Sequence, residues 1–230
     1  MNMDNKTYEY VEDRSMTIQQ YINNIFKWMV IGVLTTFVTA FALERTSFMA
    51  HAGVLPLLLV VFQFAVVIRL SRHLMTMKPA TAKALYITYS VITGITFSYV
   101  ISSYTGFTVS LAFLVAAIYF GVLVILGTVV KMDLTRIGTI CLAGLFVYII
   151  FSVIVMIFHL GMGTLIMPLI SLALFAGITA YDMQKSLQLY NHASSNPEML
   201  EKLSIYGAFN LYLDFVNIFL DILQLLGDNK

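Results

Sequence analysis

The chain has 230 residues, of which 60% are hydrophobic and only 11% are charged, and its mean hydropathy is +0.87. A soluble protein carries about 25% charged residues, so this composition excludes a soluble domain and indicates a membrane protein. The formal net charge is +1 and no basic patch alternates with aromatic residues, which argues against nucleic acid as a partner.

The first 26 residues are polar, carry charges of both signs and lack the pattern of a cleavable signal peptide. We therefore predict a polar cytoplasmic segment (1–26) followed by one transmembrane domain (27–230). Seven apolar windows follow, at or near the length of about 20 residues that crosses the hydrocarbon core. They lack the alternation of barrel strands, so we predict an all-α polytopic membrane protein, a bundle of seven transmembrane helices. The windows are Trp28–Leu43, Val54–Ile68, Ala84–Tyr104, Phe107–Val130, Ile137–Leu160, Thr164–Leu187 and Ser204–Leu226.

The basic residues predict the orientation of the bundle, because the cytoplasmic ends of membrane helices are enriched in Lys and Arg. With seven helices and a cytoplasmic N-terminus, eleven of the 13 basic residues fall on the cytoplasmic side. Only Arg45 and Lys230 fall on the outer side, where the C-terminus is then expected. The short tails and loops favour a bacterial inner membrane over an organelle membrane.

Three aspartates, Asp182, Asp214 and Asp221, lie inside the last two apolar windows, where an ionised side chain costs about 3 kcal/mol or more. Asn210, Asp214, Asn217 and Asp221 follow one another at spacings of four, three and four, so they form one narrow stripe on a helix. Such a stripe is typical of the wall of an ion path, which makes Asn210, Asn217 and Asp221 candidate pore-lining residues. A hydrogen-bonded seam that only holds helices together is the alternative.

Asp182 and Asp214 are predicted to lie at compatible depths in the cytoplasmic half of the membrane. At about 1.5 Å per residue, Asp182 is about 5–10 Å and Asp214 about 15 Å from the cytoplasmic ends of their helices. Two carboxylates in a medium of low dielectric cannot both ionise cheaply, so the pair is expected to share a proton and sense pH. When deprotonated, both would attract calcium as candidate metal ligands. Alternatively, Asp182 pairs with Lys185 near the interface.

The residues around these aspartates resemble those of the transmembrane Bax-inhibitor-motif family. The similar runs are Ala180-Tyr-Asp-Met-Gln184, Asn210-Leu-Tyr-Leu-Asp-Phe-Val-Asn-Ile-Phe219 and Thr93-Gly-Ile-Thr-Phe97. The resemblance implies a compact bundle with the C-terminal helix at its centre. It also implies a pH-sensitive calcium leak of the bacterial type, gated by a di-aspartyl sensor at Asp182 and Asp214. An arginine of the second helix is expected to latch the first aspartate, and the candidates are Arg69 and Arg72.

Three functions remain open at this stage. The first is a calcium or other cation channel without a cofactor, in which calcium is the transported or transiently bound ion and protons regulate it. The second is a regulator that binds a membrane protease or a death-pathway protein. The third is an intramembrane aspartyl protease, whose Tyr-Asp run matches Tyr181–Asp182. Such a protease has Gly-x-Gly-Asp on the next helix, whereas this chain has Leu211-Tyr-Leu-Asp214, so we expect that the protein is not an enzyme.

Overall fold

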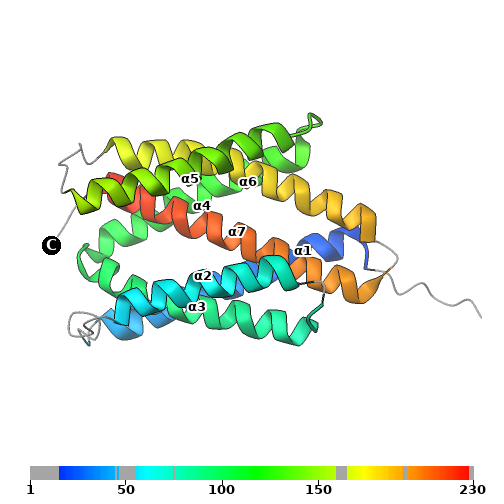
Figure 1. Cartoon of the computed structure of the whole chain (residues 1–230), viewed down its shortest axis with the longest axis horizontal. Coiled ribbons are helices and arrows are strands. Elements are labelled where there is room, and N and C mark those ends of the chain that lie inside the picture. Colours follow the sequence, from blue (N-terminus) through cyan, green and yellow to red (C-terminus); the bar gives the residue numbers. More distant parts are fainter. Residues whose placement is uncertain are drawn as a thin grey trace, which may run out of the picture.

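The computed structural model describes residues 16–44, 46, 55–74, 76–158, 165–193 and 196–227. Within these ranges the chain forms seven helices joined by short connections, which confirms the predicted all-α polytopic architecture (Figure 1). The helices are α1 (Ile18–Glu44), α2 (Leu55–His73), α3 (Pro79–Ser102), α4 (Gly106–Val129), α5 (Thr135–Ile157), α6 (Ile166–Ala193) and α7 (Pro197–Leu226). Counted over the described residues, six of them, all but the 19-residue α2, are long and apolar enough to cross a membrane. Residues 1–15 and the predicted window boundaries at Val54, Leu160 and Thr164 lie outside the described residues.

Helix α7 has clear start and stop signals in the sequence. It begins at Pro197, a residue that is tolerated in the first turn because the N–H it lacks would have no partner there. Asn196 caps this end, since its side chain accepts a hydrogen bond of 3.0 Å from the Met199 N–H. The helix ends at Gly227, whose φ of 61° lies in the left-handed region that favours glycine.

Helix α1 begins ten residues before the predicted window, at Ile18 instead of Trp28. The extra turns stay helical because one of their faces is buried against the bundle: Tyr21 and Ile25 are both 0% exposed. The ring of Tyr21 lies 5.3 Å from that of Tyr190 on α6. Residues 18–26 therefore belong to the helical bundle, and the hydrophobic window identified only the more apolar part of a longer helix.

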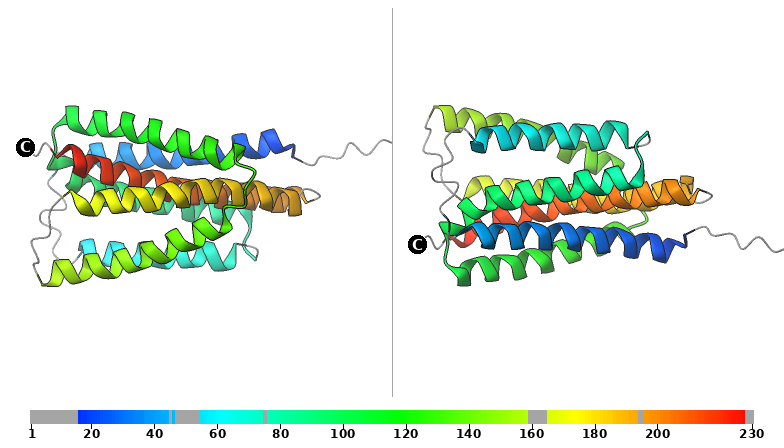
Figure 2. Two further views of the ribbon diagram at one scale, coloured as in Figure 1. Left: turned by 90° about the horizontal axis from the view of Figure 1, so that it is seen from above. Right: turned by 90° about the horizontal axis from the view of Figure 1, so that it is seen from below.

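Helix α7 lies at the centre of the bundle, as the family resemblance implied. It packs against α1, α3, α4 and α6, and 61% of its apolar window is buried, compared with 33% in α1, α4 and α6 and 6% in α5. Helix α2 packs mainly on α3, and α5 packs on α6. Both views of Figure 2 show α2 and α5 on the same side of the bundle, and Figure 1 shows α7 passing between the α5–α6 pair and the α2–α3 pair.

A buried chain of hydrogen bonds holds α7 against α1 and α3. Tyr212 Oη lies 2.7 Å from Thr36 Oγ1, and this hydroxyl donates to the carbonyl oxygen of Ser90 at 3.0 Å. Because Thr36 has one hydroxyl proton and uses it on Ser90, the Tyr212 hydroxyl must be the donor to Thr36. Gly94 allows α1 and α3 to approach at this level, since a Cβ there would lie 2.5 Å from the Thr36 carbonyl oxygen.

The turn between α4 and α5 is held by a side chain of α6. Gln184 Oε1 accepts a hydrogen bond from the Leu134 N–H at 2.8 Å, and Nε2 donates to the carbonyl oxygens of Val130 at 3.2 Å and Met132 at 2.9 Å. One amide thus satisfies three backbone groups of the turn. The glutamine that ends the Ala-Tyr-Asp-Met-Gln run therefore has a structural contact of its own, away from α7.

Candidate functional site

The candidate site lies along the interface between the antiparallel helices α6 and α7 (Figure 1). Three pairs of residues face one another along it: Ser186 with Gly207, Thr179 with Asp214, and Ser171 with Asp221. Steps of seven residues along α7 are matched by steps of seven and eight along α6, which is the pattern of two antiparallel helices in constant register. This register brings Asp214 to the level of the segment that contains Asp182.

Asp214 is the most deeply buried carboxyl group of the site, with 3% of the residue exposed. Its Oδ2 is buried and has no hydrogen-bond partner among the described residues, and the same is true of the neighbouring hydroxyl, Thr179 Oγ1. The Asp182 carboxyl is close enough for the two charges to act on each other. A buried carboxylate without compensating hydrogen bonds is costly, so this arrangement favours a proton or a cation at Asp214.

Asp182 is half-buried and lies one turn along α6 from Thr179, on the side that faces α7. Its backbone carbonyl accepts a hydrogen bond of 2.8 Å from the Ser186 hydroxyl. Lys185 is near enough for its charge to act on the Asp182 carboxyl, but the two groups form no ion pair within 4.0 Å. The Lys185 ammonium lies instead over the Tyr181 ring, 5.4 Å from its centroid. The structure therefore does not show a direct ion pair between Lys185 and Asp182.

The predicted polar stripe of α7 divides into two edges. Asp214 and Asp221 are buried on the edge that faces α6. Asn210 and Asn217 are half-buried and lie on the most accessible line of the helix, which contains Tyr206, Asn210, Leu213, Asn217, Leu220 and Gln224. Since α1, α3, α4 and α6 cover the other faces of α7, this line faces the side of the bundle where α2 and α5 lie (Figure 2).

Arg69 and Arg72, the candidate latch residues, are both exposed on α2. Neither contributes to the ion pairs found within the described ranges, which are Lys83–Glu201 and Lys202–Glu198. Helix α2 is held on α3 by the buried Leu70 and by a hydrogen bond of 2.9 Å from Gln63 Nε2 to Thr93 Oγ1. The structure thus brings neither arginine to Asp182 or Asp214, and the latch stays a prediction.

The candidate calcium ligands are two carboxylates rather than a larger acidic cluster. No group of three or more His, Cys, Asp or Glu side chains that could hold a metal ion occurs in the part of the chain that the structure describes. Asp182 and Asp214, together with the Thr179 hydroxyl, supply only part of the six to eight oxygen ligands that calcium takes. A cation between them would keep water or backbone ligands, which suits transient binding better than a permanent site.

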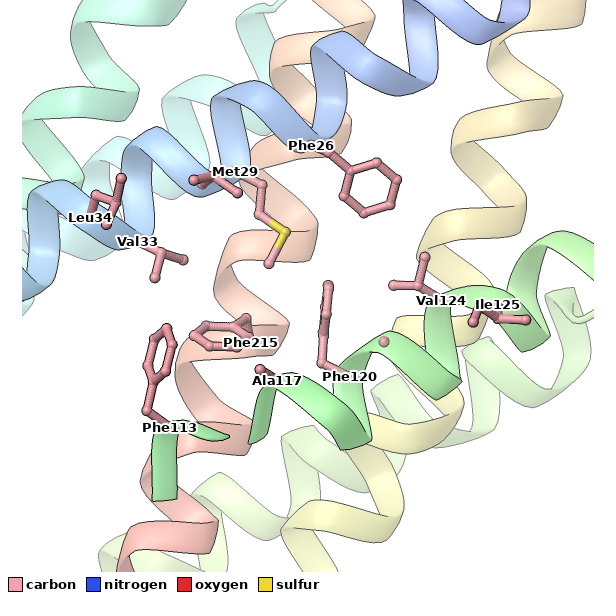
Figure 3. Close-up of a pocket in the computed structure, with 12 residues that line it drawn as sticks. Phe26, Met29, Val33, Leu34, Phe113, Ala117, Phe120, Val124, Ile125 and Phe215 are labelled. Carbon is pink, nitrogen blue, oxygen red and sulfur yellow. The ribbon is translucent and has the colours of Figure 1, made fainter. Parts of the chain in front are cut away.

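A separate groove lies on another side of α7, between α1 and α4 (Figure 3). It has a volume of about 460 Å³ and is lined by apolar residues only, among them Met29, Phe120 and Phe215. Gly121 borders the groove and has nothing within 4 Å of the position of a Cβ. With no polar ligand in its lining, the groove is not a site for an ion.

A bundle of seven helices whose central helix carries buried carboxyl groups defines a polytopic helical membrane protein. Residues 18–230 match the family described as inhibitor of apoptosis-promoting Bax1, and the chain belongs to this family. It is 34% identical over 212 residues to a protein of Deinococcus radiodurans, covering 90% of each chain. It is 32% identical over 223 residues to the inner membrane protein YbhL of Escherichia coli K12, covering 93% of each chain. A third relative, from Borreliella burgdorferi, is 28% identical over 223 residues, covering 92% of this chain and 93% of the relative.

The hydroxyl residues that face the α7 carboxyl groups, Thr179 and Ser171, were not predicted from the sequence. Thr179 and Ser171 are single hydroxyl residues in an apolar helix, and such residues are common wherever membrane helices pack closely. Their spacing of eight residues, close to the seven between Asp214 and Asp221, is the one signal that pairs them with the aspartates. Gln224, at the accessible edge of α7, was also missed because it lies in the last turn, where a polar side chain is ordinary.

Proposed function

We propose that this protein is a pH-sensitive leak path for calcium, gated by a proton that Asp182 and Asp214 share. One observation carries the proposal: Asp214 is buried with an unpartnered carboxylate oxygen beside an unpartnered hydroxyl and within electrostatic reach of a second carboxyl group. No arginine or lysine forms an ion pair with either aspartate among the described residues. A site of this kind is stable with a proton and unstable as two bare charges.

The proton determines whether the two helices hold together at this level. With the proton bound, the pair carries at most one negative charge and α6 stays packed on α7, so the path is closed. Loss of the proton leaves two carboxylates in a poorly solvated interface, where their repulsion separates the groups and attracts a divalent cation. Calcium flux is therefore expected to increase as the pH rises.

The accessible edge of α7 is the proposed wall of the path. Asn210 and Asn217 lie two turns apart on it and are half-buried, so their amide groups can replace part of the water around a passing ion. From the distribution of basic residues we infer that Pro197, at the start of α7, is on the cytoplasmic side and that calcium enters at the other end. On the same grounds, and with YbhL described as an inner membrane protein, we propose a bacterial inner membrane as the location.

The test is calcium flux into liposomes that contain the purified full-length protein and a calcium dye, recorded across a series of pH values. Wild-type protein should give flux that rises with pH. Asp214→Asn and Asp182→Asn should remove the pH dependence, because an amide has no proton to lose in this range. Asp133→Asn is the matched control, since this aspartate is exposed in the α4–α5 turn. No flux in the wild type, or an unchanged pH profile in Asp214→Asn, would refute the proposal.

The two alternative functions make different demands on the same residues. A protease would need Tyr181 near the paired carboxyl groups, but its ring occupies the space beside Gly138 of α5. This packing argues against the protease alternative, and cleavage of a helical reporter that depends on both aspartates would revive it. A regulator that acts through a membrane-protein partner would keep its cellular phenotype in Asp182→Asn and Asp214→Asn, whereas a leak path would lose it.

A further inference from the structure

The carboxyl group of Asp221 is as unusual as that of Asp214, but it lies about 10 Å further along α7, seven residues later. The residue is 8% exposed, and its Oδ2 is buried without a hydrogen-bond partner among the described residues. The hydroxyl group that faces it belongs to Ser171, which is 3% exposed. Each α7 carboxyl group thus faces one buried hydroxyl of α6, and the second pair is separate from the proposed gate.

Within the described residues, no cation forms an ion pair with Asp221. The last turns of α1, α3, α5 and α7, which end on this side of the bundle, contain no basic residue. The described first turns of α2, α4 and α6 on the same side contain none either. The two ion pairs found in the described part of the chain involve the first turns of α7, at the other end of that helix. A carboxylate buried beside these helix ends is stabilised by a bound cation or by a proton.

Neutral oxygen atoms lie next to Asp221, on the adjacent accessible edge of α7. Asn217 is one turn before Asp221, and its Nδ2 donates to the Leu213 carbonyl oxygen at 2.7 Å, which leaves the amide oxygen available as a ligand. Gln224, three residues after Asp221, is exposed near the end of the helix. One carboxylate with hydroxyl and amide oxygens and with water is the ligand set of a hard cation.

We propose that Asp221, Ser171 and Asn217 form a calcium-binding station at the C-terminal end of α7, through which the ion passes before it reaches Asp214. The station adds a second ion-binding site to the proposed calcium path, and its role in conduction depends on that proposed function. With one carboxylate the site should be weak, with a dissociation constant of about 10⁻⁴–10⁻³ M, as in other calcium sites of low charge. Weak binding is what a conducted ion requires, because it must enter the site and leave it again.

The first experiment measures binding without flux. The thermal unfolding of the full-length protein in detergent is followed at about pH 8, where exposed carboxyl groups are ionised, over about 10⁻⁶–10⁻² M calcium chloride. A ligand that binds only the folded state raises the unfolding temperature once its concentration exceeds the dissociation constant, and the rise then grows with the logarithm of the concentration. Asp221→Asn keeps the shape of the residue and should raise the calcium concentration needed for a given increase in unfolding temperature at least tenfold. Ser171→Ala should raise that concentration severalfold. Ser110→Ala, an exposed hydroxyl at the same end of the bundle, should leave it unchanged.

The second experiment repeats the liposome assay with varied external calcium. Asp221→Asn should raise the half-saturating calcium concentration for flux and leave the pH midpoint in place, whereas Asp214→Asn should change the pH dependence. If the wild type shows a calcium shift that depends on Asp221 but no flux, the station stands and the leak function fails. If flux is gated by pH while Asp221→Asn and Ser171→Ala both bind calcium like the wild type, the station is wrong and the leak function stands.

Discussion

The hydrogen bond between Tyr212 and Thr36 should measurably stabilise the position of α7, the helix that carries Asp214 and Asp221. Tyr212→Phe removes only the phenol oxygen, 2.7 Å from Thr36 Oγ1, and keeps the edge-to-face ring contact with Tyr86 at 5.5 Å. Thr36 keeps its own bond to Ser90, so one neutral buried hydrogen bond is lost. The expected loss in the free energy of unfolding is about 0.6–1.5 kcal/mol, the range for such bonds in proteins and in membrane bundles.

Thr36→Val extends the same prediction to a double-mutant cycle. The valine removes both bonds of the threonine hydroxyl and leaves the Tyr212 hydroxyl without its acceptor, so its effect should exceed that of Tyr212→Phe. In the double mutant the unpartnered phenol is gone, so the two effects should differ from additivity by at least about 0.5 kcal/mol. Unfolding is measured by titration with a denaturing detergent, with Tyr99→Phe as the control because this phenol is 59% exposed. Equal stability of Tyr212→Phe and the wild type, or strictly additive effects, would refute the reasoning.

Three further predictions use residues away from the carboxyl groups. Gly94→Ala should destabilise the fold by about 1–3 kcal/mol, because its Cβ meets the backbone of α1, whereas Gly121→Ala, which has open space, should raise stability by about 0.5–1 kcal/mol. Gln184→Leu should lower the free energy of unfolding by about 2–3 kcal/mol, since three hydrogen bonds to the α4–α5 turn are lost; a change below about 0.5 kcal/mol would contradict this. The Thr135 hydroxyl and N–H donate to Asp133 and hold the pKa of its carboxyl below the usual range. This carboxylate therefore stabilises the fold at pH values above its unfolded pKa of about 3.9, and the stabilisation is lost as the pH falls through the lowered folded pKa. Asp133→Asn should remove that acid-side component from thermal unfolding measured against pH.

The helix layout could be predicted from local signals, because each membrane helix shows its apolar window and its end residues in the sequence. The alternation of basic and non-basic ends matches seven antiparallel helices, although α7 begins at Pro197, before the predicted window at Ser204. The start of α1 was placed too late, at Trp28, because hydropathy detects the lipid-facing part of a helix. Tyr21 and Ile25 extend α1 by packing on neighbours, and such contacts are not visible in a hydropathy window.

The candidate site was predicted less completely than the helices. The spacing of Asn210, Asp214, Asn217 and Asp221 gave the stripe on α7, since helical geometry determines which residues share a face. Its division into an accessible amide edge and a buried carboxyl edge depends on which helices cover α7, and one helix cannot show this. Which hydroxyl groups of α6 face the aspartates depends in the same way on the register between α6 and α7. Whether an arginine can reach Asp182 depends on where α2 packs.

The proposed gate requires that one proton, shared by Asp182 and Asp214, closes the path. Infrared spectroscopy of the liposome-embedded protein detects a protonated carboxyl group directly and can be recorded at the same pH values as the flux. We expect a protonated-carboxyl band that disappears over the pH range in which calcium flux appears, and that is missing or displaced in Asp182→Asn and Asp214→Asn. A band that persists while flux rises, or that is unchanged in both variants, would contradict it.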